Sequence, residues 1–120
     1  MNHNIKGTGI AITGELREYT EKKLSATEKF IYKDTGAHVD IELEYSEVRD
    51  GGKYRAEFTL STHGRVHRIE EWGSSMHEAI DVAVVALVKD LRRNKSKHMR
   101  MMRQGAKQIK DFVRGFRDRF

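Results

Sequence analysis

Two stretches of alternating apolar and polar residues constrain the fold of this chain more than any other feature. Residues 39–45 and 54–60 each place an apolar side chain at every second position, with charged or hydroxyl side chains between them. Such alternation predicts β-strands that bury one face and leave the other in water. The segment Asp50-Gly51-Gly52 between the two stretches is a hairpin signal. We therefore expect an antiparallel pair of strands joined by a turn.

Two further strands flank this pair in the sequence. An apolar piece around Ile5 predicts a short first strand, and residues 66–72 predict a fourth strand after a turn at residues 63–65. The direction in which the fourth strand faces is open, because Val66 and Ile69 are both apolar and lie out of phase. A β-bulge between them would reconcile the two positions.

Two helices are expected between and after the strands. Thr13 suits an N-cap and precedes apolar residues at helical spacing, so a first helix should run to near Tyr32. Ser75 and Glu78 fit a capping box that opens a long second helix. The core stripe predicted for the second helix consists of Ile80, Ala83, Val84, Leu87 and Leu91.

The order of these elements predicts an α+β fold of the type β-α-β-β-β-α. Its four-stranded sheet would carry both helices on one face, with the last three strands as an antiparallel meander and the first strand at an edge. The other face should be wet, and it carries Glu42, Glu44, Arg55 and Glu57. Val82 and Val85 lie on the outer side of the second helix, outside its core stripe, where another element could pack on them.

The basic charge of the chain is concentrated at its C-terminal end. Residues 97–120 hold eight of the 23 lysines and arginines but only two of the 18 acidic residues, whereas residues 1–96 are nearly neutral. We therefore divide the chain into a domain over residues 1–98 and a basic amphipathic tail over residues 99–120. A cationic segment of this kind indicates a polyanionic partner, either nucleic acid or an anionic membrane surface.

The apolar residues of the tail fall on one face of a predicted helix. They are Ile109, Phe112, Val113, Phe116 and Phe120. A basic segment with such a stripe could lie along a nucleic acid, self-associate with a second copy of the chain or sit on an anionic membrane.

Basic side chains also gather towards the ends of both predicted helices. Phosphate recognition needs such side chains to converge, and two helices packed side by side would provide one surface. The candidate nucleic-acid-binding residues are Lys22, Lys23, Lys29, Lys89, Arg92, Arg93, Lys95, Lys97 and Arg100. Two alternative roles stay open, because bases at a helix C-terminus favour the helix dipole, and Lys22 and Lys29 could pair with glutamates one turn away.

Composition excludes several classes of site. Disulfides and thiolate metal sites are excluded because the chain has no cysteine. The six histidines lack ligand spacing and no nucleophile stands with a base, so we expect no metal, no cofactor and no enzymatic activity. Asp81 interrupts an apolar run, but we expect it to face solvent. No apolar run is long enough to span a bilayer and the N-terminus lacks a signal-peptide pattern, so a cytoplasmic location is expected.

Three stretches in this order carry a family resemblance. One is Gly7 with Ile12-Thr13 and residues 16–24, another surrounds residues 54–57, and the third runs from residues 76–81 to the bases before residue 98. Together they resemble the ribosome hibernation-promoting factor / ribosome-associated inhibitor A family, also called the sigma-54 modulation protein family, over residues 3–98. The chain departs from the family pattern in two places. Ser74-Ser75 replaces an acidic pair, and His77 stands where tyrosine is usual.

The resemblance implies a fold similar to the double-stranded-RNA-binding domain. It also implies that the partner is the small ribosomal subunit and its rRNA, bound in the decoding cleft over the mRNA and tRNA sites. Initiation would then be blocked and ribosomes would stay idle under stress, with no small-molecule substrate involved. The alternative from a different class is a membrane-surface or protein-interaction module that acts through the basic tail.

Overall fold

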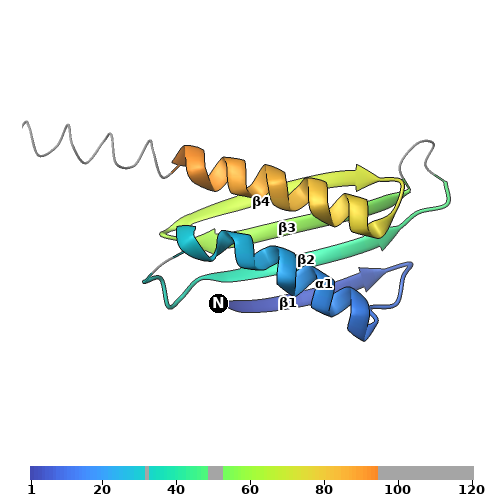
Figure 1. Cartoon of the computed structure of the whole chain (residues 1–120), viewed down its shortest axis with the longest axis horizontal. Helices are drawn as coiled ribbons and strands as arrows, with labels where there is room; N and C mark the ends of the chain where they lie inside the picture. Colours follow the sequence, from blue (N-terminus) through green and yellow to red (C-terminus); the bar gives the residue numbers. More distant parts are fainter. Residues whose placement is uncertain (32, 49–52, 95–120) are drawn as a thin grey trace, which may run out of the picture.

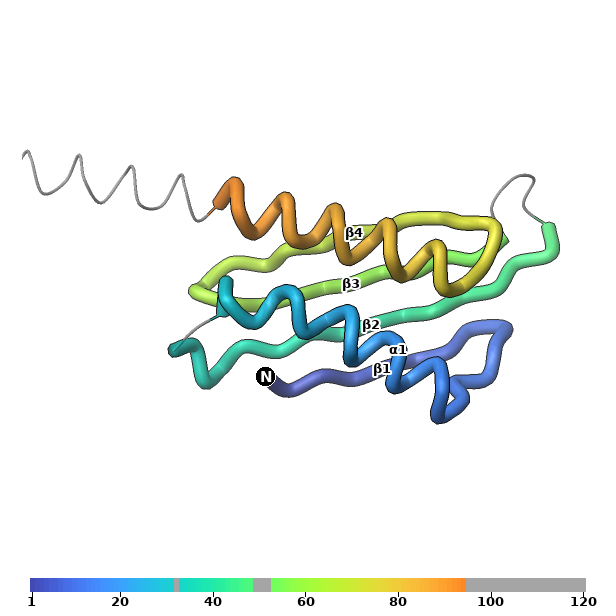
Figure 2. Tube along the Cα trace, viewed as in Figure 1, coloured from blue at the N-terminus to red at the C-terminus, as the bar shows by residue number. Residues whose placement is uncertain are grey.

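The strands and helices follow the predicted order in the computed structural model of the chain, which describes residues 1–31, 33–48 and 53–94 (Figure 1). The strands are β1 (Asn2–Thr8), β2 (His38–Tyr45), β3 (Tyr54–Thr62) and β4 (Arg65–Gly73). The helix α1 (Gly14–Leu24) continues into a 3-10 helix, η1 (Ser25–Phe30), and a second helix covers residues 76–94. Both helices lie side by side over one face of the sheet (Figures 1 and 2), so the predicted α+β fold is confirmed.

The sheet has the strand order β1-β2-β3-β4. β1 pairs parallel to β2, with Ile5 opposite Ile41, while β3 pairs antiparallel to both of its neighbours. The parallel pair follows from α1 and η1, which carry the chain back to the end of the sheet where β1 began. The predicted meander and the edge position of the first strand are therefore confirmed.

The facing of β4 follows from an unbroken register with β3. The two strands pair without interruption along their whole length, so β4 contains no bulge. His67 points towards the helices and is 4% exposed, whereas Val66 points to the open face and is 67% exposed. The inward position suits His67 because the carboxylate of Asp90 lies 2.7 Å from its Nδ1. β4 therefore has the usual alternation of inward and outward side chains. The hydropathy pattern does not show it, because His67 faces inward and Val66 faces outward.

Both predicted N-caps are formed. The Leu16 N–H donates to the Thr13 hydroxyl, and the Glu78 N–H donates to the Ser75 hydroxyl, each at 3.1 Å. The carboxylate of Glu78 accepts a further hydrogen bond, at 2.6 Å, from the hydroxyl of Ser74. Each cap satisfies a backbone N–H that a helix start would otherwise leave without a partner.

The first helix changes type before its predicted end near Tyr32. Regular α-helix ends at Leu24, and the tighter turns of η1 follow. The Ser25 hydroxyl donates to the carbonyl of Lys22 at 2.6 Å, and the Thr27 hydroxyl donates to the carbonyl of Leu24 at 2.7 Å. Hydroxyls that bind carbonyls three residues back compete with the regular helical ladder, which favours the tighter turn.

The hydrophobic core lies between the sheet and the two helices. Leu43, Phe58 and Leu60 supply it from the strands and are fully buried. The predicted stripe of the second helix is buried against them, with no member more than 5% exposed. Because each buried valine, leucine, isoleucine or phenylalanine contributes about 1.5–3 kcal/mol, this layer fixes which side of the helix faces outward.

One arginine organises the open face of the sheet. Arg55 is 9% exposed, and its guanidinium forms ion pairs with Glu42, Glu44, Glu57 and Glu70. Its Nε lies 2.7 Å from Glu44 and its Nη1 lies 3.2 Å from Glu57. We call these five residues the open-face network. The prediction of a wet face was too simple for Arg55, because the surrounding carboxylates bury it.

Candidate nucleic-acid interface

The two helices run in the same direction across the sheet (Figure 2). Near their starts, Glu15 Oε1 lies 3.3 Å from His77 Nε2. One turn further along each helix, the Tyr19 hydroxyl donates to Asp81 at 2.6 Å. One turn later on α1, Lys23 Nζ lies 3.4 Å from the same carboxylate. The contacts move towards the C-terminus on both helices in step, so the two helices are parallel. Their C-terminal turns therefore lie at the same end of the sheet.

Five of the predicted binding residues are exposed towards the ends of these helices. We call them the helix-end bases, and they are Lys22, Lys29, Lys89, Arg92 and Arg93. Within the part of the chain that the structure describes, none of the five has a carboxylate at ion-pair distance. The pairing of Lys22 and Lys29 with glutamates one turn away is therefore not formed there. A favourable interaction with the helix dipole stays compatible, since it needs no bound carboxylate.

Lys23 has different surroundings from Lys22, although the two are adjacent in the sequence. Its ammonium pairs with Asp81 and lies 5.5 Å from the centre of the Tyr19 ring. Asp81 also accepts the Tyr19 hydrogen bond, which, with burial and the charge of Asp81, raises the pKa of Tyr19. Asp81 therefore links the two helices while its side chain stays 44% exposed, so it faces solvent in part, as predicted. A role of Lys23 in binding stays a prediction.

Lys95, Lys97 and Arg100 lie outside the described residues, as does the tail with its apolar stripe. The division of the chain near residue 98 is likewise still a prediction. Val82 and Val85 are 41% and 56% exposed on the outer side of the second helix, so no described element covers them.

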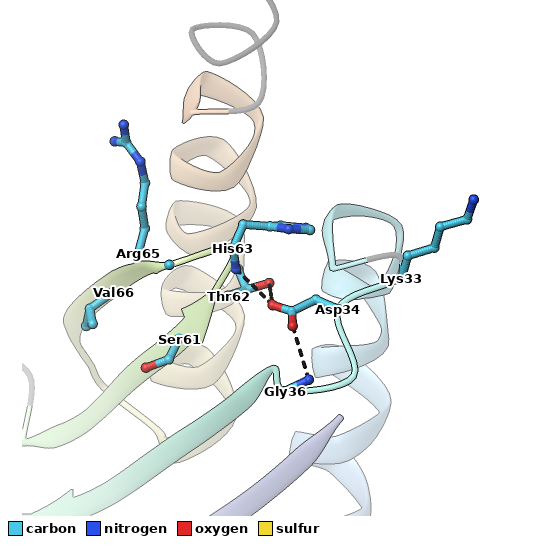
Figure 3. A pocket seen from close by; sticks show the side chains of 9 residues that line it. Lys33, Asp34, Gly36, Ser61, Thr62, His63, Arg65 and Val66 are labelled. Atoms are coloured by element: carbon cyan, nitrogen blue, oxygen red, sulfur yellow. Dashed lines mark hydrogen bonds between the residues drawn. The ribbon is translucent and has the colours of Figure 1, made fainter. Parts of the chain in front are cut away.

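The fold brings further basic residues to the same end, and the sequence did not single them out. Lys33, His63 and Arg65 border a hollow between the loop after η1 and the β3–β4 turn (Figure 3). Arg65 Nη1 lies 3.5 Å from Asn94 Oδ1, which links this turn to the end of the second helix. The sequence places His63 and Arg65 in a turn, but only the tertiary fold shows that the turn adjoins the helix ends.

Within the described residues, no group of three or more histidine, cysteine, aspartate or glutamate side chains could hold a metal ion. Over the same residues, none of the helices has the length and apolar character needed to cross a membrane. The exposed chemistry at the shared end of the helices is cationic, which suits an anionic surface such as a nucleic-acid backbone.

A four-stranded sheet backed by two parallel helices, with bases at their shared end, defines the class as a small α+β domain suited to polyanion binding. Residues 3–99 match the model of the family described as sigma 54 modulation protein / S30EA ribosomal protein. The chain belongs to this family, and the resemblance predicted from its sequence is confirmed.

Curated relatives match this chain over part of their own sequence. It is 31% identical over 104 residues to a ribosome hibernation promotion factor of Deinococcus radiodurans, and 28% identical over 104 residues to one of Bacillus subtilis. These matches cover 86% and 87% of this chain but 53% of each relative. The chain thus spans about half the length of the curated relatives it matches.

Solved structures show the same fold. The N-terminal domain of Thermus thermophilus Protein Y is 28% identical, with a TM-score of 0.68 over 78% of this chain and 98% of that domain. A ribosomal subunit interface protein from Coxiella burnetii has a TM-score of 0.67 over 80% of this chain and 99% of its own. Its 20% identity makes this second likeness one of fold alone.

Proposed function

We propose that the chain is a ribosome-binding inhibitor of translation with no catalytic activity. It binds the small subunit in the decoding cleft, over the mRNA and tRNA sites, and keeps ribosomes idle under stress. The observation that carries the proposal is the set of five exposed helix-end bases, none of which has a carboxylate partner among the described residues. The names of the curated relatives support a role in ribosome hibernation.

The mechanism is occupation of a site, without a covalent step. Arg92 and Arg93 can each hold a phosphate with two parallel hydrogen bonds, whereas Lys22, Lys29 and Lys89 act as point charges. Contacts of this kind go to the sugar-phosphate backbone and therefore respond to the shape of rRNA more than to its sequence. An mRNA or tRNA could not enter the cleft while the domain fills it.

The tail, residues 99–120, adds to the same interaction in this proposal. Deletion of residues 105–120 removes five basic residues and should weaken binding while the remaining domain still binds. Log affinity falls as log salt rises, and each lost phosphate contact should make this slope shallower by about 0.7 to 0.9. An unchanged slope with loss of concentration-dependent assembly would instead assign the tail to self-association.

The direct test is sedimentation of the purified chain with isolated ribosomal subunits at several salt concentrations. Co-sedimentation with small subunits, weakening as salt rises, is expected, together with inhibition of translation in a reconstituted system. Failure to sediment with small subunits at moderate salt would contradict the proposal. Flotation with anionic liposomes tests the alternative, because a membrane-surface module would float and a ribosome-binding domain would remain in solution.

A further inference from the structure

The hollow beside the β3–β4 turn is organised by one carboxylate (Figure 3). Asp34 Oδ2 accepts hydrogen bonds from the Thr62 hydroxyl at 2.7 Å and from the His63 N–H at 2.8 Å. Asp34 Oδ1 accepts a third bond from the Gly36 N–H at 3.1 Å. The loop after η1 and the β3–β4 turn are therefore tied together by side-chain and backbone groups from both segments.

The backbone around this hollow is held in an uncommon conformation. Lys33 and His63 have φ values of 67° and 50°, and Gly64 has a φ of 74°. The left-handed region costs a residue other than glycine about 1–2 kcal/mol. At residues 63 and 64, positive φ is what a two-residue β-hairpin turn between Thr62 and Arg65 requires. The hydrogen bonds from Thr62 and His63 to Asp34 tie this turn to the loop after η1.

Arg65, on the rim of the hollow, differs from the other arginines of the sheet. Arg55 and Arg68 are both ion-paired with glutamates on the open face. Arg65 is exposed, and no described carboxylate lies within ion-pair distance of it. Its contact with Asn94, at 3.5 Å, is at the outer limit of a hydrogen bond and leaves most of the guanidinium donors available.

The position of Arg65 makes it continuous with the helix-end bases. Asn94 directly follows Arg92 and Arg93 in the last described turn of the second helix. Lys33 lines the hollow on the side opposite Arg65, and its side chain extends outward (Figure 3). Three elements, namely the second helix, the β3–β4 turn and the loop after η1, thus present basic side chains at one end of the molecule.

We propose that Arg65, on the rim of the hollow, forms a second contact for the sugar-phosphate backbone of a nucleic acid. This inference rests on the proposed function and extends its binding surface from the helices to the β3–β4 turn. Arginine suits the task because its planar fork matches a phosphate, and the tied turns hold it in place before binding. Asp34 holds the two segments in place and does not contact the nucleic acid, since its oxygens already accept three hydrogen bonds within the protein.

The test compares Arg65→Gln with Arg68→Gln, which removes the same charge from the same strand on the opposite face. Binding to isolated small subunits is measured for both variants and the wild type over a salt series. Arg65→Gln should weaken binding about tenfold, as expected for one charge-assisted hydrogen bond. It should also make the slope of log affinity against log salt shallower by about 0.7 to 0.9. Equal affinities and slopes for the two variants would overturn the proposal while leaving the proposed function intact.

A second measurement does not depend on the ribosome. NMR titration of the wild-type chain with a short uridine oligonucleotide should shift the Arg65 side-chain Nε–H signal and the Gly64 amide. The Arg68 Nε–H signal should stay in place, because Glu57 holds that group. If the helix-end residues shift and the turn does not, the second contact is wrong. If wild-type chain also fails to bind small subunits, the proposed function is wrong as well.

Discussion

The open-face network and the helix-end bases both contain arginine, but the arginines differ in burial and in their ion-pair partners. Arg55 is buried among four glutamates, whereas Arg92 and Arg93 stand exposed with no described carboxylate at ion-pair distance. In the open-face network, the cation is already paired and links three strands. The helix-end bases are left available to a polyanion. Position in the fold therefore decides which bases can bind a partner, and a count of bases does not.

The difference also orients the domain. Described acidic residues on the open face outnumber the bases there, with Asp40 and the four glutamates of the network against Lys6, Arg55 and Arg68. A phosphate backbone is repelled by such a face and attracted by the end where the helices finish. The proposed complex therefore has the helix ends against rRNA and the open face turned away.

The largest expected effect comes from reversing the helix-end charge. The double variant Arg92→Glu, Arg93→Glu should lose binding to small subunits by at least about 1,000-fold, equivalent to about 4 kcal/mol. Both positions are exposed, so the free energy of unfolding should change by less than about 0.5 kcal/mol per substitution. The matched control is Lys6→Glu with Lys53→Glu, an equal change of charge away from the helix ends. If the double variant inhibits translation at wild-type concentration, the helix ends are not the site.

Removing the central cation of the open-face network should affect folding instead of binding. Arg55→Met leaves four neighbouring carboxylates without their shared partner, and loss of one member of a buried ion pair costs about 3–5 kcal/mol. Urea unfolding should show a loss near the lower limit, because the glutamates are partly exposed. The folded fraction should bind small subunits as the wild type does. A loss of less than about 1 kcal/mol in urea would show that the network contributes no more than a surface ion pair.

Two adjacent lysines allow a finer comparison. Lys22→Met should weaken binding several-fold without changing stability, because Lys22 is exposed and has no described ion-pair partner. Lys23→Met should lower stability by about 0.5 kcal/mol, the range for a partly exposed ion pair, and should change binding less. Affinity by fluorescence anisotropy and unfolding by urea, measured on both variants, give the comparison. Equal losses of affinity would show that Lys23 leaves Asp81 to contact the partner.

The smallest effect concerns the pH dependence of stability. Hydrogen bonds, first that from Thr62 and next that from the His63 N–H, hold the pKa of Asp34 below its ordinary value of 3.8. Asp34 therefore contributes stability above the unfolded-state pKa, and the contribution is lost as the pH falls through the lowered folded-state value. The stability advantage of the wild type over Asp34→Asn should narrow as the pH falls below 3.8. Thr62→Val should weaken the same dependence, and an advantage that is constant with pH would contradict this account.

The strands, the helices and the core stripe of the second helix were predictable because period and caps are local signals. The facing of β4 was not, because His67 takes a core position only when Asp90, on another element, provides its partner. The helix-end bases were found as a pattern, and the sequence places Lys23 nearer the core edge than Lys22. The ion pair of Lys23 could not be predicted, because it depends on Asp81 across the helix pair. Arg65 was missed because its significance depends on the β3–β4 turn lying beside Asn94.

The strand order has a consequence for how the chain assembles. Thr62 pairs with Arg65 and Tyr45 with Tyr54, so the β2-β3-β4 meander closes through short loops. β1 pairs with a strand that is distant in the sequence, since Asn2 pairs with His38, 36 positions further on. Local pairs form at a lower entropic cost than distant ones, so the meander should nucleate folding and β1 should dock later. β1 is thus synthesised before β2, β3 and β4 but gains its hydrogen-bond partners after they have paired.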